Sequence, residues 1–81
     1  MYLKAARQND ANSQKNLGIA YSDGIGSPKD YVRAFAWLNV ASANGNKSAL
    51  LIRNEVMQRM TREQIVQGQA LTNNLLEELG R

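Results

Sequence analysis

The chain has 81 residues, a net charge of +3, and neither cysteine nor histidine. Its length allows one domain, and the missing residue types exclude disulfides, thiolate metal sites and the commonest general base. The ten lysine and arginine residues are scattered along the sequence, which is typical of an ordinary solvated surface. These properties predict a small non-enzymatic protein without metal or cofactor.

No apolar run in the sequence approaches the roughly 18 residues that a membrane-spanning helix needs. The sequence also does not start with a charged segment followed by an apolar leader. We therefore expect a soluble chain that does not insert into a membrane. The sequence leaves the compartment open between the cytoplasm and the periplasm.

The first residues, 1–10, combine small and apolar side chains with a polar turn, which predicts the end of a helix. Segment 5–10 matches segment 41–46 at an offset of 41 − 5 = 36 positions. A period near 36 with a helix, a turn and a helix in each unit is typical of stacked repeats. We interpret 1–10 as the tail helix of a preceding repeat.

The next helix is expected over about 11–22. Leu17, Gly18 and Tyr21 fall one turn apart and share a face, and Gly18 lacks a side chain where another helix can approach. Gly24 is expected to end this helix, because glycine adopts the left-handed conformation without steric cost. The pattern therefore predicts a closely packed helix pair.

A turn containing Gly24 and Gly26 follows, and Ile25 is its one large apolar residue. We expect Ile25 to plug the hinge between the two helices. Asp30 can accept hydrogen bonds from the free backbone N–H groups of the next helix, which is expected over about 30–43. Gly45 is the expected left-handed residue after that helix.

The 30–43 helix carries a broad arc of alternating small and large side chains, the pattern of an antiparallel helical hairpin. The arc contains Tyr31, Ala34, Phe35, Trp37, Leu38, Ala41 and Ser42.

Two further helices are expected over about 46–59 and 62–79. Asn46 can cap the first, and Thr61 with Gln64 forms the capping-box pattern at the start of the second. Gly68 lies inside the last helix, where glycine costs about 1 kcal/mol relative to alanine. We expect it to mark a close approach to the 46–59 helix.

These motifs resemble the Sel-one-like repeats (SLR), which are relatives of the tetratricopeptide repeats (TPR). The resemblance covers about one full unit, 11–45, with 1–10 as a preceding tail and 46–81 as a divergent closing helix pair similar to the tail of bacterial members. It implies an all-α fold of antiparallel hairpins stacked as a TPR/SLR-type superhelix, or solenoid fragment. The matching residues are Leu17, Gly18, Tyr21, Gly24, Gly26, Asp30, Tyr31, Ala34, Trp37, Ala41 and Gly45.

By the same resemblance, the chain is a scaffold or adaptor that binds a protein or peptide rather than an enzyme. The family geometry implies a binding face along the first helix of each pair. Helical-wheel position then assigns to this face Asn12, Lys15, Asn16, Ile19 and Leu51.

Two alternatives remain open at the level of the sequence. The chain is a structural cap of a longer array with no partner of its own, or it is a helix-turn-helix-like nucleic-acid binder. The 30–43 helix has only Arg33 as a cation and begins with an acidic residue, so its charges argue against binding to nucleic acid. Self-association through the segment from Met1 to Ala6 is a further expectation, because a helix lacking its neighbour exposes an apolar face.

Overall fold

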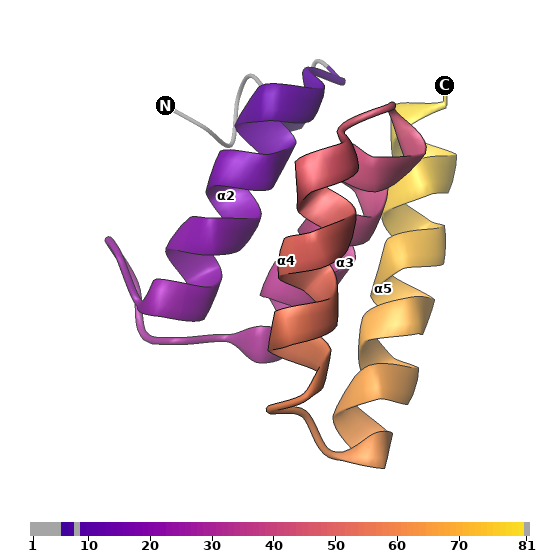
Figure 1. Cartoon of the computed structure of the whole chain (residues 1–81). Coiled ribbons are helices and arrows are strands. Elements are labelled where there is room, and N and C mark those ends of the chain that lie inside the picture. Colours follow the sequence, from indigo (N-terminus) through magenta and orange to yellow (C-terminus); the bar gives the residue numbers. More distant parts are fainter. Residues whose placement is uncertain (1–5, 8, 81) are drawn as a thin grey trace.

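The computed structural model describes residues 6–7 and 9–80, and in these ranges it contains helices and turns but no strand. The helices are α2 (Ala11–Asp23), α3 (Tyr31–Ala43), α4 (Lys47–Met57) and α5 (Arg62–Leu79) (Figure 1). Successive helices run in opposite directions, so the predicted all-α fold of antiparallel helices is confirmed. Most of the segment from Met1 to Ala6, where self-association is expected, lies outside the described residues.

Each of these helices begins at a side chain that caps it. Asp10 accepts hydrogen bonds from the first turn of α2, and Asp30 does so for α3. Asn46 caps α4, and Thr61 with Gln64 forms a complete capping box at the start of α5. The three caps predicted from the sequence are therefore confirmed. None of the described helices is both long and apolar enough to cross a bilayer.

The turns repeat with the period that the sequence predicts. Gly45 has a φ of 96°, and Asn9, which precedes it by 45 − 9 = 36 positions, has a φ of 68°. The Asn9 N–H donates to the Ala6 carbonyl at 3.1 Å, and the Gly45 N–H donates to the Ser42 carbonyl at 3.0 Å. Both pairs occupy equivalent repeat positions, so one left-handed turn geometry serves two units.

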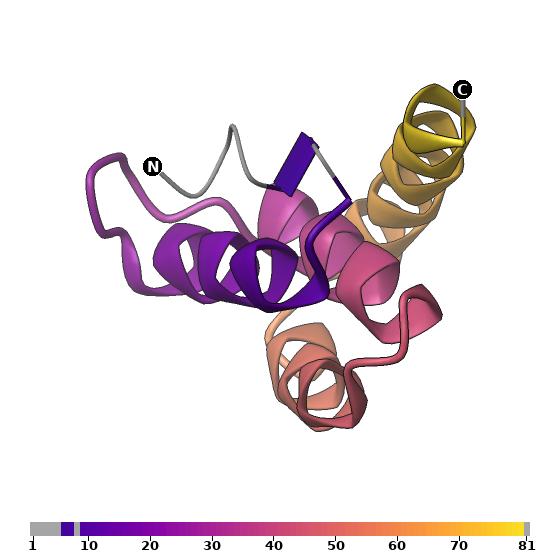
Figure 2. The same cartoon turned by 90° about the horizontal axis from the view of Figure 1, so that it is seen from above.

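Helix α3 is the centre of the molecule. Viewed from above, α2, α4 and α5 surround it (Figure 2). The sequence pattern predicted one broad buried arc, but burial extends further around the helix to Ala36 and Val40. The buried residues of α3 are Ala34, Phe35, Ala36, Trp37, Leu38, Val40 and Ala41.

The core has two parts, one on each side of α3. Trp37 packs in a cluster with Leu17 of α2 and Leu75 of α5. Phe35, in contrast, packs in a cluster with Val56 of α4. Because α3 contributes to both clusters, each of the other helices is stabilised mainly by burying apolar surface against it.

Two glycines mark places where helices come close. A Cβ atom added at Gly18 would lie 2.7 Å from the Leu38 Cγ atom, so α2 and α3 approach closely, as predicted. A Cβ atom added at Gly68 would lie 2.5 Å from the Phe35 Cδ2 atom. The sequence prediction that Gly68 faces the 46–59 helix is therefore wrong, because α5 packs against α3 and the Phe35 ring occupies the space.

The predicted apolar plug of the hinge is also absent. The Ile25 side chain is 65% exposed. The hinge is instead closed by the backbone, since the Ile25 N–H donates to the Ala20 carbonyl and the Asp30 N–H donates to the Tyr21 carbonyl, both at 2.9 Å. Main-chain hydrogen bonds thus fix this turn without burying its one large apolar side chain.

Replacement of Ile25 by alanine is therefore expected to change the free energy of unfolding by no more than about 0.5 kcal/mol, the usual range for an exposed side chain. Urea unfolding followed by circular dichroism measures this change. A loss above about 1 kcal/mol would show that Ile25 does support the hinge.

Candidate functional site

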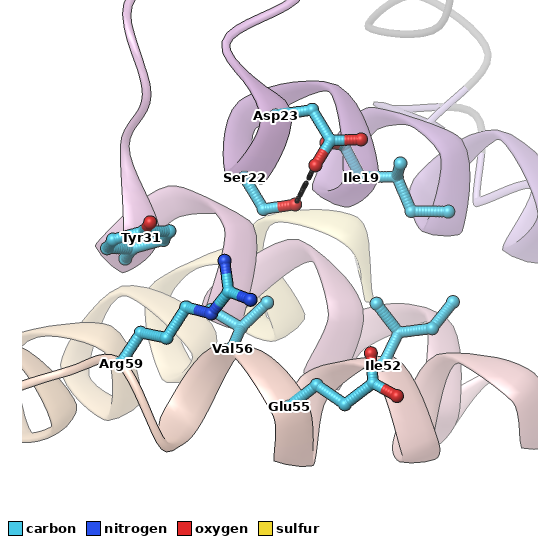
Figure 3. A pocket seen from close by; sticks show the side chains of 8 residues that line it. All are labelled: Ile19, Ser22, Asp23, Tyr31, Ile52, Glu55, Val56 and Arg59. Carbon is cyan, nitrogen blue, oxygen red and sulfur yellow. Dashed lines mark hydrogen bonds between the residues drawn. The ribbon is translucent and has the colours of Figure 1, made fainter.

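A hollow of about 280 Å³ lies between α2 and α4, which run side by side along α3 (Figure 1). We call it the α2–α4 groove. Its lining residues are Ile19, Ser22, Asp23, Tyr31, Ile52, Glu55, Val56 and Arg59 (Figure 3).

The floor of the α2–α4 groove is apolar. Ile19 of α2 and Ile52 of α4 are half-buried, and Val56 is only 5% exposed. The two isoleucines come from facing helices (Figure 3). Their partial exposure means that an apolar side chain of a ligand placed between them would bury further surface.

The rim of the groove carries charges of both signs. Asp23 accepts a hydrogen bond from the Ser22 hydroxyl at 3.4 Å, and Arg59, in the turn that follows α4, lines the groove (Figure 3). Among the described residues, Asp23, Glu55 and Arg59 take part in no ion pair. Their charges are available to a bound molecule. Within the residues that the structure describes, no group of three or more aspartate, glutamate, cysteine or histidine side chains is placed to hold a metal ion.

Spacing along the two helices explains this lining. Ile19 is followed in the lining by residues three and four positions later on α2, and Ile52 by residues three and four positions later on α4, whereas Arg59 lies in the turn beyond the end of α4. Such positions lie above one another on an α-helix. This regularity is visible in the sequence, although wheel position assigned only Ile19 among these residues to a binding face.

The structure separates the residues that wheel position assigned to a binding face. Ile19 lines the α2–α4 groove, whereas Asn12, Lys15 and Asn16 lie on α2 outside its lining. Leu51 is 67% exposed on α4 and also lies outside the lining.

Asn12 has a specific contact at one end of this face. Its Oδ1 atom accepts a hydrogen bond from the Asn46 Nδ2 atom at 3.1 Å, which links α2 to the cap of α4. Lys15 and Asn16 are half-buried. The polar part of the predicted face is therefore partly used to hold the two helices together.

The family motif residues occupy the core and the turns. Leu17, Ala34, Trp37 and Ala41 are buried, Gly18 marks the α2–α3 contact, and Tyr21 and Tyr31 pack half-buried against the core. Gly24, Gly26 and Gly45 have positive φ angles, and Asp30 is a cap.

A second hollow, of about 220 Å³, lies on another side of α3. Its charged groups are already engaged, because Arg7 pairs with Glu78 at 3.4 Å and Arg33 pairs with Asp30 at 3.5 Å. The Arg33 guanidinium also lies 5.8 Å from the centre of the Tyr21 ring. The second hollow therefore offers a ligand fewer charged side chains without an ion-pair partner among the described residues than the α2–α4 groove does. It is lined by Arg7, Tyr21, Arg33, Trp37, Leu71 and Leu75.

Comparison with known proteins places this geometry in a family. The Sel1 repeat model matches residues 1–10 and 11–46. A crystal structure of a protective antigen of uropathogenic Escherichia coli strains, described as displaying an SLR fold, is 34% identical, with a TM-score of 0.93 over 96% of this chain. The chain spans 17% of that protein's length. No match was found among curated proteins. On the family model and this similarity, the chain belongs to the Sel1 repeat family.

Proposed function

We propose that the chain is a protein-interaction module that binds a protein or peptide segment in the α2–α4 groove. The observation that carries this proposal is the combination in one hollow of a half-buried apolar floor and charged groups without ion-pair partners among the described residues. An apolar side chain of the partner would enter between Ile19 and Ile52. Polar groups on either side of it would pair with the rim.

The predicted face extends this site along the two helices. Asn12, Lys15 and Asn16 continue it along α2, and Leu51 continues it along α4. An extended segment of a partner that follows the groove would meet these side chains next. Repeats of this kind stack to form elongated binding surfaces, which supports an adaptor role over a catalytic one.

The position of α3 argues against the helix-turn-helix alternative. A recognition helix places exposed side chains in the major groove of DNA. Helix α3, the second helix of the hairpin, is instead covered by α2, α4 and α5. Its few outward positions leave little surface for base contacts.

Selection of a displayed random peptide library against the immobilised domain tests the proposal. We expect peptides whose affinity falls about tenfold in the Ile19→Ala and Ile52→Ala variants, because each change removes apolar contact worth about 1–2 kcal/mol. Fluorescence anisotropy with the selected peptide measures the affinity. Circular dichroism of each variant shows whether it remains folded.

A matched control lies on α5, where Val66 is 59% exposed and outside the groove. Val66→Ala removes a similar apolar surface and is expected to leave the affinity unchanged. Equal losses in all three variants, or a selected peptide insensitive to Ile19 and Ile52, would place the binding site elsewhere.

A second candidate function is a structural cap of a repeat array. The observation that favours it is the polar outer side of α5, which a terminal element needs in order to face water. A folded domain that selects no peptide at all would support this role. The exposed polar residues of α5 include those that the sequence places on its outer side, Glu63, Gln67, Asn73, Asn74 and Glu77.

A further inference from the structure

Three amide side chains join the two repeat turns. Gln14 is fully buried, and its Nε2 atom donates to the Ala6 carbonyl at 2.9 Å and to the Asn9 Oδ1 atom at 3.2 Å. The Asn44 Nδ2 atom donates to the same Asn9 Oδ1 atom at 2.7 Å and to the Gln14 Oε1 atom at 2.8 Å. We call these three residues the amide network.

The direction of the amide network is fixed by the backbone. A carbonyl oxygen only accepts hydrogen bonds, so the group of Gln14 that faces Ala6 must be its NH2 group. The Gln14 oxygen then faces Asn44, and the group that Asn44 presents must be a donor. The position of the Ala6 carbonyl thus requires an NH2 group on Asn44.

Asn44 is followed by Gly45 in an exposed turn. In an asparagine-glycine pair, the glycine has no side chain that would hinder the attack of its backbone nitrogen on the side-chain amide carbon of the asparagine. We propose that Asn44 is a site of spontaneous deamidation, that the amide network keeps this reaction slow, and that the product opens the connection between the two turns.

The reaction needs only water and solvent base. The Gly45 nitrogen loses its proton to base and attacks the Asn44 Cγ atom, and the Cγ–Nδ2 bond breaks with release of ammonia. The resulting succinimide is then opened by water at either carbonyl. Opening at Cγ yields aspartate, with a carboxylate in place of the side-chain amide, and opening at the backbone carbonyl yields isoaspartate, in which the main chain runs through Cγ and the former backbone carbonyl becomes the carboxylate.

In the folded structure, hydrogen bonds restrain both reacting groups, the Gly45 N–H and the Asn44 side-chain amide. The Gly45 N–H donates to the Ser42 carbonyl at 3.0 Å, and the Asn44 amide makes its two hydrogen bonds within the network. The turn itself gives little steric protection, because a Cβ atom added at Gly45 would meet nothing within 4 Å. Protection therefore comes from hydrogen bonds, and it is lost when they open.

Deamidation would make the loss of these hydrogen bonds permanent. A carboxylate at position 44 is an acceptor only. It would face the oxygen atoms of Asn9 and Gln14, which now accept from Asn44. Since Gln14 is buried, its oxygen would lose its hydrogen-bond donor without access to water.

Mass spectrometry of the protein incubated at mildly alkaline pH measures the reaction at Asn44. We expect the native protein to deamidate more slowly than the urea-unfolded protein. Asn9→Gly, which removes one acceptor while keeping a residue suited to a φ of 68°, should accelerate deamidation about fivefold, the effect of one lost hydrogen bond. If Asn9→Gly does not fold, Gln14→Met, of similar size, removes the other acceptor and carries the same expectation.

The repeat itself offers a control. Gly45→Asn places at this turn the residue that occupies the equivalent position 9, so the backbone is tolerated while the attacking nitrogen becomes hindered. This variant is expected to deamidate at Asn44 much more slowly. Equal rates in the native and unfolded protein would overturn the protective role of the network. Equal thermal midpoints of the wild type and Asn44→Asp would overturn the structural consequence.

Discussion

Replacement of Trp37 by alanine is expected to lower the free energy of unfolding by about 3–5 kcal/mol. The Trp37 side chain is 3% exposed and packs with Leu17 and Leu75, so its removal leaves a cavity among residues of three helices. A domain of this length is stable by only about 4–12 kcal/mol in total. Urea unfolding followed by far-UV circular dichroism would show a large shift of the midpoint.

The Trp37→Phe variant is the matched control. It retains an aromatic ring in the same cluster and is expected to lose much less stability than Trp37→Ala. A loss below about 1 kcal/mol for the alanine variant would show that this cluster contributes less than its burial indicates. The chain has one tryptophan, so fluorescence is not a suitable probe for this comparison.

Replacement of Gly18 by valine is expected to lower the free energy of unfolding by about 2–3 kcal/mol through overpacking. The new Cβ atom would lie 2.7 Å from the Leu38 Cγ atom and 3.2 Å from the Ala34 carbonyl oxygen. Leu38 is fully buried and cannot move into solvent. The helix-propensity gain over glycine is only a few tenths of a kcal/mol, so the steric cost dominates. Chemical unfolding measures the sum.

A double-mutant cycle identifies the cause of this loss. Leu38→Ala creates room for the valine at position 18, so the double variant is expected to be more stable than additivity predicts by at least about 0.5 kcal/mol. Strict additivity of Gly18→Val and Leu38→Ala would show that the destabilisation does not arise from their contact.

Helix boundaries were predictable because their causes are local. Asp30, Asn46 and Thr61 each bond to a backbone N–H group three residues later. Such interactions join residues that are close in sequence, so they depend little on the tertiary structure around them. The capping box between Thr61 and Gln64 is the clearest case.

The partners of each helix were harder to predict. The expectation for Gly68 assumed that helices adjacent in sequence pack together. In the structure, α5 contacts α3 instead, and Phe35 fills the space beside Gly68. Likewise, a wheel pattern cannot show that a small residue such as Ala36 is buried when three neighbours surround the helix.

The candidate site was only partly predictable for the same reason. Ile19 was assigned to a binding face from its wheel position, but Ile52 was not. The α2–α4 groove exists because two non-consecutive helices leave space between them, which depends on their relative placement. The amide network was missed because Gln14 is polar, and its burial depends on two turns meeting in space.

The central position of α3 also has a kinetic consequence. Helices α2 and α4 have only 13 and 11 residues, and helices of this length are marginal in water without a partner. Each finds its main partner in α3. We therefore expect the folding nucleus to contain α3 together with the first helix to dock on it. Destabilising changes within α3 should slow folding, whereas changes confined to the outer face of α5 should mainly speed unfolding.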